Sequence, residues 1–350
     1  MNILLVSNMY PSEKFPAFGS FIQKIEKNLS SHDDCNVEVV TIDNEYSSKT
    51  ELFYYYLKFI FKCFFLILKQ RHDVVFVHFV SHSYIPFLFL PRFLIKKMVI
   101  NFHGSDLNTE SKLFKKINAI AIRKANLIIV PSKYFKKLLL KIHNTKDENI
   151  FISPSGGIPR YFYNKNKLHK RDYITCGYVG RVIDKKGWKT FVNAISDLEN
   201  RKYNVKGIIV GPGNPEIVNG YIMKLKTSNN INYLGAIPNK KLSAIFEELD
   251  IFIFPTMFNE SLGLAPLEAM AHSIPAICSN CDATSSYIMD GVNGFLFEKG
   301  NSKELSEKII KFINLSEDEK NNFKDEAFKK ALEYRDIDVS DKLYNKFKKI

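Results

Sequence analysis

Two series of short apolar runs alternate with helical stretches along this chain. Such a rhythm is typical of βα units, in which strands lie parallel in one sheet and helices cover its faces. The first series comprises residues 2–7, 37–42, 74–79, 98–102 and 127–130, and the second comprises residues 173–179, 206–211, 231–234, 251–254 and 275–278. We therefore predict an α/β protein with two Rossmann-like halves.

A cluster of chain-breaking residues separates the two series. Residues 153–159 read Ser-Pro-Ser-Gly-Gly-Ile-Pro, and polar residues follow as far as Asp172. Proline and glycine in such a cluster favour a linker between domains. With 350 residues, of which 45% are hydrophobic, the chain is long enough for two cores. We place the first domain at residues 1–165 and the second at residues 166–334.

Two glutamates, Glu260 and Glu268, follow the apolar run at 251–254. Pro266 suits the first turn of a helix, so the order is strand, loop and helix. Backbone amides near the start of that helix would bind an anion. The carboxylates beside them would accept hydrogen bonds from sugar or ribose hydroxyls. In the alternative interpretation, Glu260 is a solvated loop residue and Glu268 is an acid in the first helical turn.

Further loops after strands of the second series carry polar or glycine residues. Arg181 and Lys186 follow the first of these strands, and an arginine fork with a lysine point charge suits a diphosphate. In the alternative, both are ordinary surface charges. Gly211 and Ile237 lie in two more such loops, between which a flat base would fit. The chain has no Gly-x-x-x-x-Gly-Lys-Ser/Thr motif, which argues against an ordinary phosphate-loop ATPase.

In the first half, Gly19 and His103 follow predicted strands. Gly19 precedes a helix, where it either leaves room for a ligand or only turns the chain. His103 ends the fourth strand, where open α/β sheets bind ligands. It either donates a hydrogen bond to a substrate oxygen or is a satisfied strand-end histidine. We expect His78 and His82 to line the same cleft without binding metal.

The positive charge is concentrated in the first half. Residues 1–170 contain 25 basic and 13 acidic residues, against 25 and 24 in residues 171–350. A basic half favours an anionic partner, either a membrane surface or nucleic acid. In the predicted helix over residues 51–69 the charged residues share one side and the rest is apolar, so the helix either fills a core or meets lipid. Its two central lysines make a membrane span unfavourable. We expect peripheral attachment to a membrane through this domain, helped by the aromatic residues around Arg92.

Cysteine usage and the start of the chain bear on the compartment. Five cysteines, an odd number, favour a reduced, cytosolic protein. Met1 leads straight into the first strand, so we expect no secretory signal.

Taken in order, these motifs resemble the retaining glycosyltransferases of the GT-B fold, the group 1 (family 4) type with a Glu, seven residues, Glu signature. The resemblance implies two facing Rossmann-like domains with an interdomain cleft. It also implies that a helix at residues 335–350 packs back on the first domain. The residues that carry it are Gly19, His103 to Asp106, Gly180-Arg181, Lys186-Gly187, Glu260 to Glu268 and Gly291 to Leu296.

The resemblance also implies a role for each site residue. Arg181 and Lys186 would bind the donor diphosphate and stabilise its departure, and Glu260 would contact the transferred sugar. Glu268 would hold the ribose, and Gly263 and Leu264 would offer backbone amides. His103 would face the donor sugar. Gly19, Gly211 and Ile237 would complete the donor site, with no metal and no other cofactor.

The expected activity is metal-independent transfer of a sugar from a nucleotide-sugar to a saccharide acceptor with retention of configuration. We expect the acceptor to be lipid-linked, the pathway to be surface polysaccharide or glycan biosynthesis, and the place to be the cytoplasmic face of the cell membrane. Nucleic acid is not an expected partner. One alternative is a nucleotide-sugar epimerase of the same fold. Another is a non-catalytic module that binds an anionic polymer. Ser155 and His272-Ser273 depart from the usual family pattern.

Overall fold

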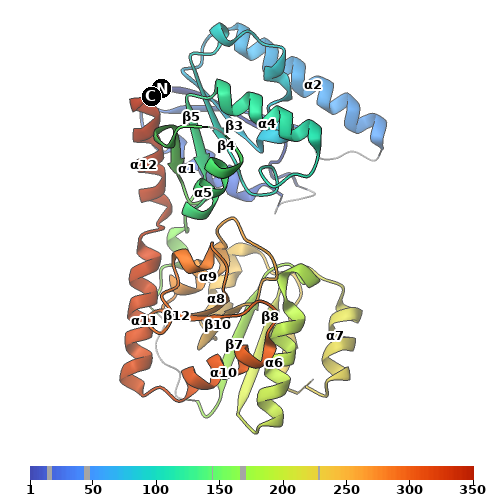
Figure 1. Ribbon diagram of the computed structural model, residues 1–350, viewed down its shortest axis with the longest axis vertical. Helices are drawn as coiled ribbons and strands as arrows, with labels where there is room; N and C mark the ends of the chain where they lie inside the picture. Colours follow the sequence, from blue (N-terminus) through green and yellow to red (C-terminus); the bar gives the residue numbers. More distant parts are fainter. Residues whose placement is uncertain (14–17, 43–47, 144, 166–170, 228) are drawn as a thin grey trace. The chain divides into compact units, whose positions relative to one another are not determined.

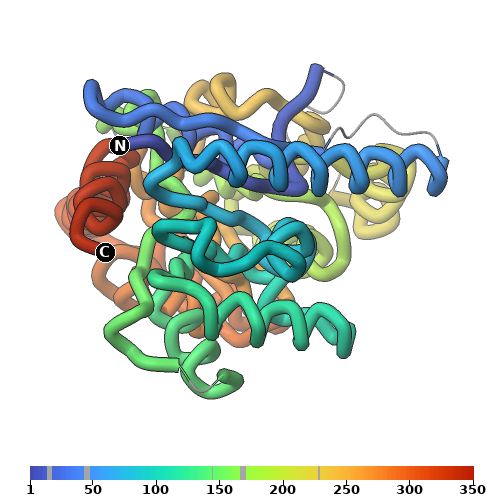
Figure 2. Tube along the Cα trace, turned by 90° about the horizontal axis from the view of Figure 1, so that it is seen from above, coloured from blue at the N-terminus to red at the C-terminus, as the bar shows by residue number. Residues whose placement is uncertain are grey.

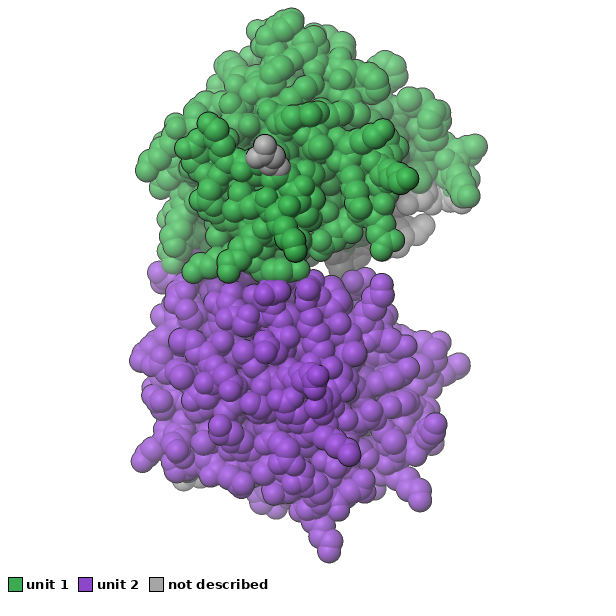
Figure 3. Space-filling view, in the orientation of Figure 1, with its two compact units in different colours: residues 1–157, 336–350 green, residues 158–335 purple. Residues whose placement is uncertain are grey.

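The computed structural model describes residues 1–13, 18–42, 48–143, 145–165, 171–227 and 229–350. They form two compact units, residues 1–157 with 336–350 (unit 1) and residues 158–335 (unit 2), coloured separately in Figure 3. Our sequence-based boundary at 165/166 adjoins residues 166–170, which lie outside the described residues. Residues 158–165 belong to unit 2, because the buried Phe162 packs against Phe246 and His272 there.

Unit 1 contains a six-stranded parallel sheet with the order β2-β1-β3-β4-β5-β6 (Figure 1). The strands are β1 Asn2–Ser7, β2 Asn36–Thr41, β3 Val74–His78, β4 Lys97–Asn101, β5 Leu127–Val130 and β6 Ile150–Ile152. The first five confirm the predicted strands to within one residue at each end. β6 was not predicted, because its three residues run directly into the proline and glycine cluster.

Helices cover both faces of this sheet. They are α1 Ser20–Ser30, α2 Lys49–Leu68, α3 Val80–Ser83, α4 Lys112–Lys124, α5 Lys133–Ile142 and α12 Asp336–Lys349. One apolar cluster joins Ile22 of α1 and Phe347 of α12 to Phe76 of β3. A second joins Phe59 of α2 and Phe135 of α5 to the opposite face, through residues such as Val77. Alternate residues of each strand thus point into the two cores.

Unit 2 repeats the architecture with the order β12-β11-β10-β7-β8-β9, again all parallel. The strands are β7 Ile174–Val179, β8 Val205–Val210, β9 Ile231–Tyr233, β10 Ile251–Phe254, β11 Ala276–Ser279 and β12 Gly294–Phe297. The helices are α6 Trp188–Asn200, α7 Pro215–Lys224, α8 Leu242–Phe246, α9 Leu264–Met270, α10 Ser302–Ile313 and α11 Glu317–Leu332. The motif from Gly291 to Leu296 overlaps β12, but no strand was predicted there.

The strand order places one switch point in each sheet. In unit 1 the chain moves from β1 out to β2 and then to β3 on the other side of β1; in unit 2, β7 plays the part of β1 and β10 that of β3. Ligands of open α/β sheets bind at the carboxyl ends of the strands that flank such a point. The loops after β7 and β10, and the carboxyl ends of β1 and β3, are therefore where a site is expected.

Candidate active site

The loops after β7 and β10 in unit 2 are held against each other by backbone contacts. The Met257 N–H donates to the Lys185 carbonyl at 3.0 Å. Gly187 has a φ of +74°, and a Cβ added to it would lie 1.7 Å from the Pro255 carbonyl oxygen. Only glycine fits that position, since any side chain would push the two loops apart. The two loops that carry the predicted ionic residues are thus brought together.

Lys186 and Glu260 form an ion pair across these loops. The Lys186 Nζ lies 2.7 Å from Glu260 Oε1, which also accepts a hydrogen bond from the Thr256 hydroxyl at 2.9 Å. The Lys186 ammonium stands over the ring of Phe258, 4.9 Å from its centroid. Glu260 is only 7% exposed, so the interpretation of it as a solvated loop residue is wrong. Lys186 comes from the one-turn helix η5 Asp184–Lys186.

Arg181 lies on the same loop, where a hydrogen bond holds its backbone in place and no carboxylate among the described residues pairs with its side chain. Its carbonyl accepts a hydrogen bond from the Tyr178 hydroxyl at 2.8 Å, while its side chain is exposed. Burial raises the pKa of Tyr178, and the charge of Glu260 adds to the effect, so this phenol stays a neutral donor. Within the described part of the chain the Arg181 guanidinium has no ion-pair partner. It is free to bind an incoming anion.

Glu268 lies on α9, the helix that follows β10. Pro266 is in the first turn of α9, as predicted, and Gly263 caps the helix with a φ of +79°. The Tyr287 hydroxyl donates to the Gly263 carbonyl at 3.2 Å and fixes the entry of the chain to Leu264. Glu268 is the fifth residue of α9 and is 8% exposed. The interpretation of Glu268 as a first-turn acid is therefore wrong.

Gly211 and Ile237 follow β8 and β9 at the same edge of the sheet. Gly211 has a φ of +143°, and a Cβ there would lie 1.8 Å from the Gly180 carbonyl oxygen. A glycine is needed for the loops after β7 and β8 to pass each other. Ile237 is half-buried against the adjacent core. All eight predicted site residues of unit 2 thus follow the carboxyl ends of four strands, β7 to β10.

Gly19, the first of the two predicted site residues in unit 1, caps α1 with a φ of +73°. A Cβ added there would lie 2.8 Å from the Tyr10 backbone nitrogen, so the packing of the chain already requires glycine. This packing alone accounts for Gly19 as a residue that turns the chain. Room for a ligand phosphate stays a prediction.

His103, the second, is held by its own loop. The buried Asp106 Oδ1 accepts the backbone N–H groups of His103, Gly104 and Leu107 at 2.9 to 3.1 Å. Burial raises the pKa of Asp106 to about 6, although these donors favour its ionised form. The His103 ring packs between Phe21 and Phe79, and burial lowers its pKa to about 3.

The structure gives different surroundings to the two histidines that we expected to line the same cleft as His103. His78 ends β3 and is buried, with its Nδ1 2.9 Å from the Nε2 of His103. His82 packs instead on the ring of Phe114. No group of three or more histidine, cysteine, aspartate or glutamate side chains in the described ranges has an arrangement that would hold a metal ion.

Sequence reasoning missed the residues that orient this site, namely Thr256, Tyr178 and Tyr287. Thr256 could have been predicted from the sequence, because a polar residue directly after a buried strand lies at the ligand-binding edge of such a sheet. Tyr178 and Tyr287 could not have been predicted, since their hydrogen-bond partners are backbone carbonyls whose position depends on the fold.

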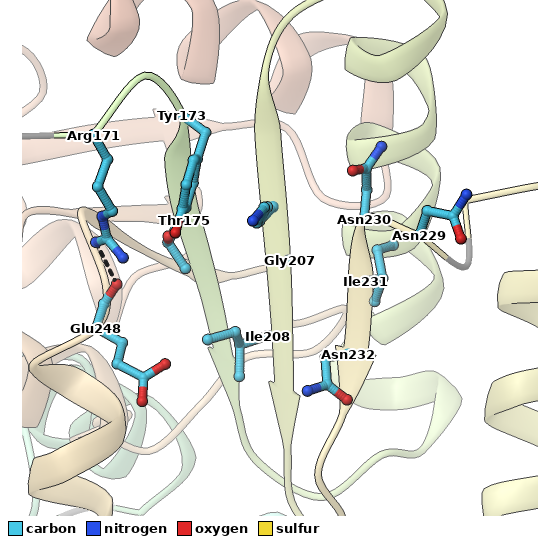
Figure 4. Close-up of a pocket in the computed structure, with 11 residues that line it drawn as sticks. Arg171, Tyr173, Thr175, Gly207, Ile208, Asn229, Asn230, Ile231, Asn232 and Glu248 are labelled. Carbon is cyan, nitrogen blue, oxygen red and sulfur yellow. Dashed lines mark hydrogen bonds between the residues drawn. The ribbon is translucent and has the colours of Figure 1, made fainter.

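An open pocket of about 470 Å³ lies at the opposite edge of the unit 2 sheet, around the starts of β7, β8 and β9 (Figure 4). Tyr173, Gly207 and Asn230 line it, and the Arg171 guanidinium beside it donates to the Glu248 carbonyl at 2.9 Å. No predicted site residue lines this pocket. It is separate from the candidate active site.

Solved structures share this fold along the whole chain. The structure of Anabaena HepE in complex with UDP and glucose superposes with a TM-score of 0.79 at 16% identity, covering 100% of both chains. Sucrose-phosphate synthase from Thermosynechococcus elongatus gives a TM-score of 0.82 at 14% identity, with 99% of this chain and 98% of that one covered. At such identities the likeness shows the fold alone, and it confirms the predicted GT-B architecture.

Similar sequences are found among curated proteins. The capsular polysaccharide biosynthesis glycosyltransferase CapM of Staphylococcus aureus is 28% identical over 56% of this chain and 54% of its own length. Alpha-monoglucosyldiacylglycerol synthase of Acholeplasma laidlawii is 28% identical over 58% of this chain and 53% of its own length. The matches thus span little more than half of these relatives.

Two family models divide the chain at nearly the same place as the two units. The model for Glycosyltransferase Family 4 matches residues 25–156, and the model for Glycosyl transferases group 1 matches residues 160–330. The chain belongs to the group 1 glycosyltransferases of the GT-B fold.

Proposed function

We propose that this protein transfers a sugar from a nucleotide-sugar to a saccharide acceptor, with retention of configuration, in the biosynthesis of a surface polysaccharide or glycolipid. The observation that carries the proposal is the Lys186–Glu260 ion pair at the switch point of unit 2, with Arg181 beside it. Cations at this edge of the sheet suit a leaving diphosphate. The names of CapM and of alpha-monoglucosyldiacylglycerol synthase support the class of product.

In the proposed reaction the bond between the anomeric carbon and the diphosphate oxygen breaks, and a bond from that carbon to the acceptor oxygen forms. The acceptor attacks from the face that the diphosphate leaves, and its proton passes to the departing phosphate oxygen. Lys186 and Arg181 stabilise the charge that builds on the diphosphate. Glu260 accepts a hydrogen bond from the transferred sugar, and Glu268 accepts one from the ribose.

A thermal-shift screen of the purified protein against nucleotides and nucleotide-sugars tests the proposal. Ligands that bind the native state raise its melting temperature. We expect one nucleotide-sugar to give a shift of equal size with and without EDTA, since we propose that no metal takes part. A shift that disappears with EDTA would contradict metal independence. The absence of any shift would contradict the donor class.

Incubation of the purified protein with the nucleotide-sugar, without an acceptor, distinguishes transfer from epimerisation. A glycosyltransferase releases nucleoside diphosphate only when an acceptor or water takes the sugar, whereas an epimerase changes the donor sugar without any acceptor. Proton NMR of the incubated nucleotide-sugar separates the two. Isomerised donor in the absence of acceptor would favour the epimerase. The configuration at the anomeric carbon of the transferred sugar, read from the same spectra, tests retention.

The two glutamates are expected to have different roles. Glu268→Ala should weaken nucleotide binding by roughly tenfold, because a carboxylate that accepts a ribose hydrogen bond is lost. Glu260→Gln should leave nucleotide binding within about threefold and lower turnover by more than tenfold, since it removes the charge that orders Lys186 and the sugar. Calorimetry with the nucleoside diphosphate and turnover assays measure both. The reverse pattern would exchange the two assignments.

We also propose that unit 1 attaches to an anionic membrane surface through α2. Figures 1 and 2 show α2 as a long helix at the outside of unit 1. Its buried residues, such as Phe59 and Cys63, pack into the core of unit 1. Exposed apolar side chains occupy a different side, and they are Phe53, Tyr54, Leu57, Phe61, Phe64, Phe65 and Leu68. At 100° per residue these seven fall within an arc of about 120°.

Basic residues border this exposed apolar arc. Lys58, Lys62 and Lys69 project next to it, at about 140° to 180° on the same helical wheel. Phe89 and Phe93, which are 76% and 84% exposed, follow the short helix Ile85–Leu88 that packs on α2. An apolar strip edged by lysines is the pattern of a helix lying in the interface of an anionic bilayer. Of the helices in the described part of the chain, none combines the length and the apolar character that crossing a bilayer requires.

A further inference from the structure

Two histidines from neighbouring strands of unit 1 form a hydrogen-bonded pair. β3 and β4 are parallel, with His78 opposite Asn101, and His103 lies two residues beyond Asn101. The His78 Nδ1 and the His103 Nε2 are 2.9 Å apart, and the ring planes differ by only 11°. The pair lies at the carboxyl ends of the two strands, next to the switch point of the sheet.

The two rings differ in their access to solvent. His78 is 0% exposed and packs on Phe76, and its Nε2 is buried without a hydrogen-bond partner among the described residues. His103 is half-buried. Its Nδ1 has no partner in the described part of the chain, and it is not among the atoms sealed from solvent. One nitrogen of the pair is therefore closed off, and one is open.

Both imidazoles are neutral near pH 7. Burial lowers the pKa of His103 to about 3 and takes that of His78 well below its usual range, with the charge of the other ring adding to the effect for His78. A neutral imidazole carries one N–H and one bare nitrogen. The hydrogen bond between the rings thus has two possible arrangements, with either His78 or His103 as the donor.

The closed nitrogen distinguishes the two arrangements. If His103 donated, the second proton of the pair would be a buried N–H on His78 Nε2 with no acceptor. If His78 donates, that Nε2 is a bare nitrogen, and unpaired buried acceptors are more common in proteins than unpaired buried donors. The Asn101 Nδ2 lies 3.5 Å from His78 Nδ1, at the outer limit of a hydrogen bond. An Asn101 amide turned by 180° presents its oxygen to that nitrogen and accepts from the Nδ1–H of His78.

We propose that His78 is a positioning residue, which donates its Nδ1–H to His103 Nε2 and so keeps the proton of His103 on the open Nδ1. That His103 faces the donor sugar rests on the function proposed above. His103 then presents a neutral N–H donor, which suits a sugar hydroxyl or ring oxygen rather than the charge of a phosphate. It cannot act as a general base, because one nitrogen accepts from His78 and the other is protonated.

Nitrogen-15 NMR of the full chain with labelled histidines tests the proposal without any substrate. Protonated and bare ring nitrogens have well-separated shifts, and the His103→Asn and His78→Asn variants assign the signals among the eight histidines. We expect a protonated Nδ1 and a bare Nε2 on both rings near pH 7. A bare Nδ1 on His103 would overturn the proposal, whatever the activity of the protein.

Turnover measurements test the consequence for the reaction. His78→Phe keeps the ring volume but removes the donor, and we expect roughly tenfold lower kcat with KM for the nucleotide-sugar within about twofold. His78→Asn places an amide N–H near the former Nδ1 and should restore kcat to within about threefold of wild type. Equal losses in both variants, or no loss in either, would contradict a positioning role.

These outcomes separate the inference from the function on which it rests. If the wild-type protein turns over no nucleotide-sugar while His103 carries its proton on Nδ1, the proposed function fails and the arrangement of the pair stands. Thermal unfolding of each variant shows whether it folds. If His78→Phe does not fold, the wild-type spectrum and the His78→Asn variant still decide the question.

Discussion

Lys186→Ala is expected to lower the turnover of nucleotide-sugar by about one hundredfold or more, the usual cost of losing one group that stabilises transition-state charge. The Lys186 ammonium is paired with Glu260 at 2.7 Å. A diphosphate carries more charge than one carboxylate, so the bound donor should draw Lys186 towards it. Saturation kinetics should show the loss mainly in kcat, because the charge on the leaving group is largest in the transition state.

The chain offers a matched control and a way to separate chemistry from folding. Lys185→Ala removes an adjacent, exposed lysine from the same short helix, and we expect turnover within about twofold of wild type. Lys186→Ala leaves the buried Glu260 without its cation, which destabilises the fold. The double variant Lys186→Ala with Glu260→Gln removes that unpaired charge, so its melting temperature should recover while its turnover stays low. Wild-type kcat in Lys186→Ala would remove the diphosphate assignment.

The sequence predicted the elements of the sheets well where local signals were strong. Buried parallel strands are continuous apolar runs, and β3 and β10 were predicted for that reason. β6 and β12 were missed, because a short strand beside glycine or proline looks like a loop. The packing of residues 158–165 with unit 2 could not be predicted from the sequence either, since a linker signal does not show to which domain the following residues belong.

The site shows the same division between local and long-range information. The loops that carry Arg181, Lys186 and Glu260 could be placed at the carboxyl ends of strands from sequence. The contact between Lys186 and Glu260 joins residues 74 positions apart and depends on the close approach of Gly187 to Pro255. The pairing of His78, rather than His82, with His103 likewise depends on the register of β3 against β4.

The character of α2 could be predicted only in part. Its composition left open whether the helix fills a core or meets lipid, and the structure shows a buried side and a separate exposed apolar side. Which residues fall on which side depends on how the helix docks on the sheet. That docking is not encoded in the periodicity of a helix that is apolar almost all round.

Replacing Phe53, Phe61 and Phe65 together with glutamine is expected to weaken binding to anionic vesicles by on the order of one hundredfold or more. These side chains are 66%, 70% and 59% exposed, so each has a large apolar area to transfer into a bilayer at about 25 cal/mol per Å². Glutamine keeps the helix propensity of the exposed side. Flotation or sedimentation with phosphatidylglycerol vesicles at low salt measures the partition coefficient.

Charge and apolar area should contribute separately to this attachment. Lys58→Gln with Lys62→Gln should lower the partition coefficient for anionic vesicles roughly thirtyfold, at about 1 kcal/mol per basic residue near the surface. It should hardly change the partition coefficient for zwitterionic vesicles.

Ile217→Gln with Met223→Gln on α7 is the matched control, because these side chains of unit 2 are 61% and 67% exposed but lie outside unit 1. The control should bind vesicles as the wild type does. If the aromatic variant binds as well as the control, α2 is not the membrane surface. If the wild-type protein does not bind anionic vesicles at low salt, the basic charge of unit 1 serves a different anionic partner, such as the acceptor itself.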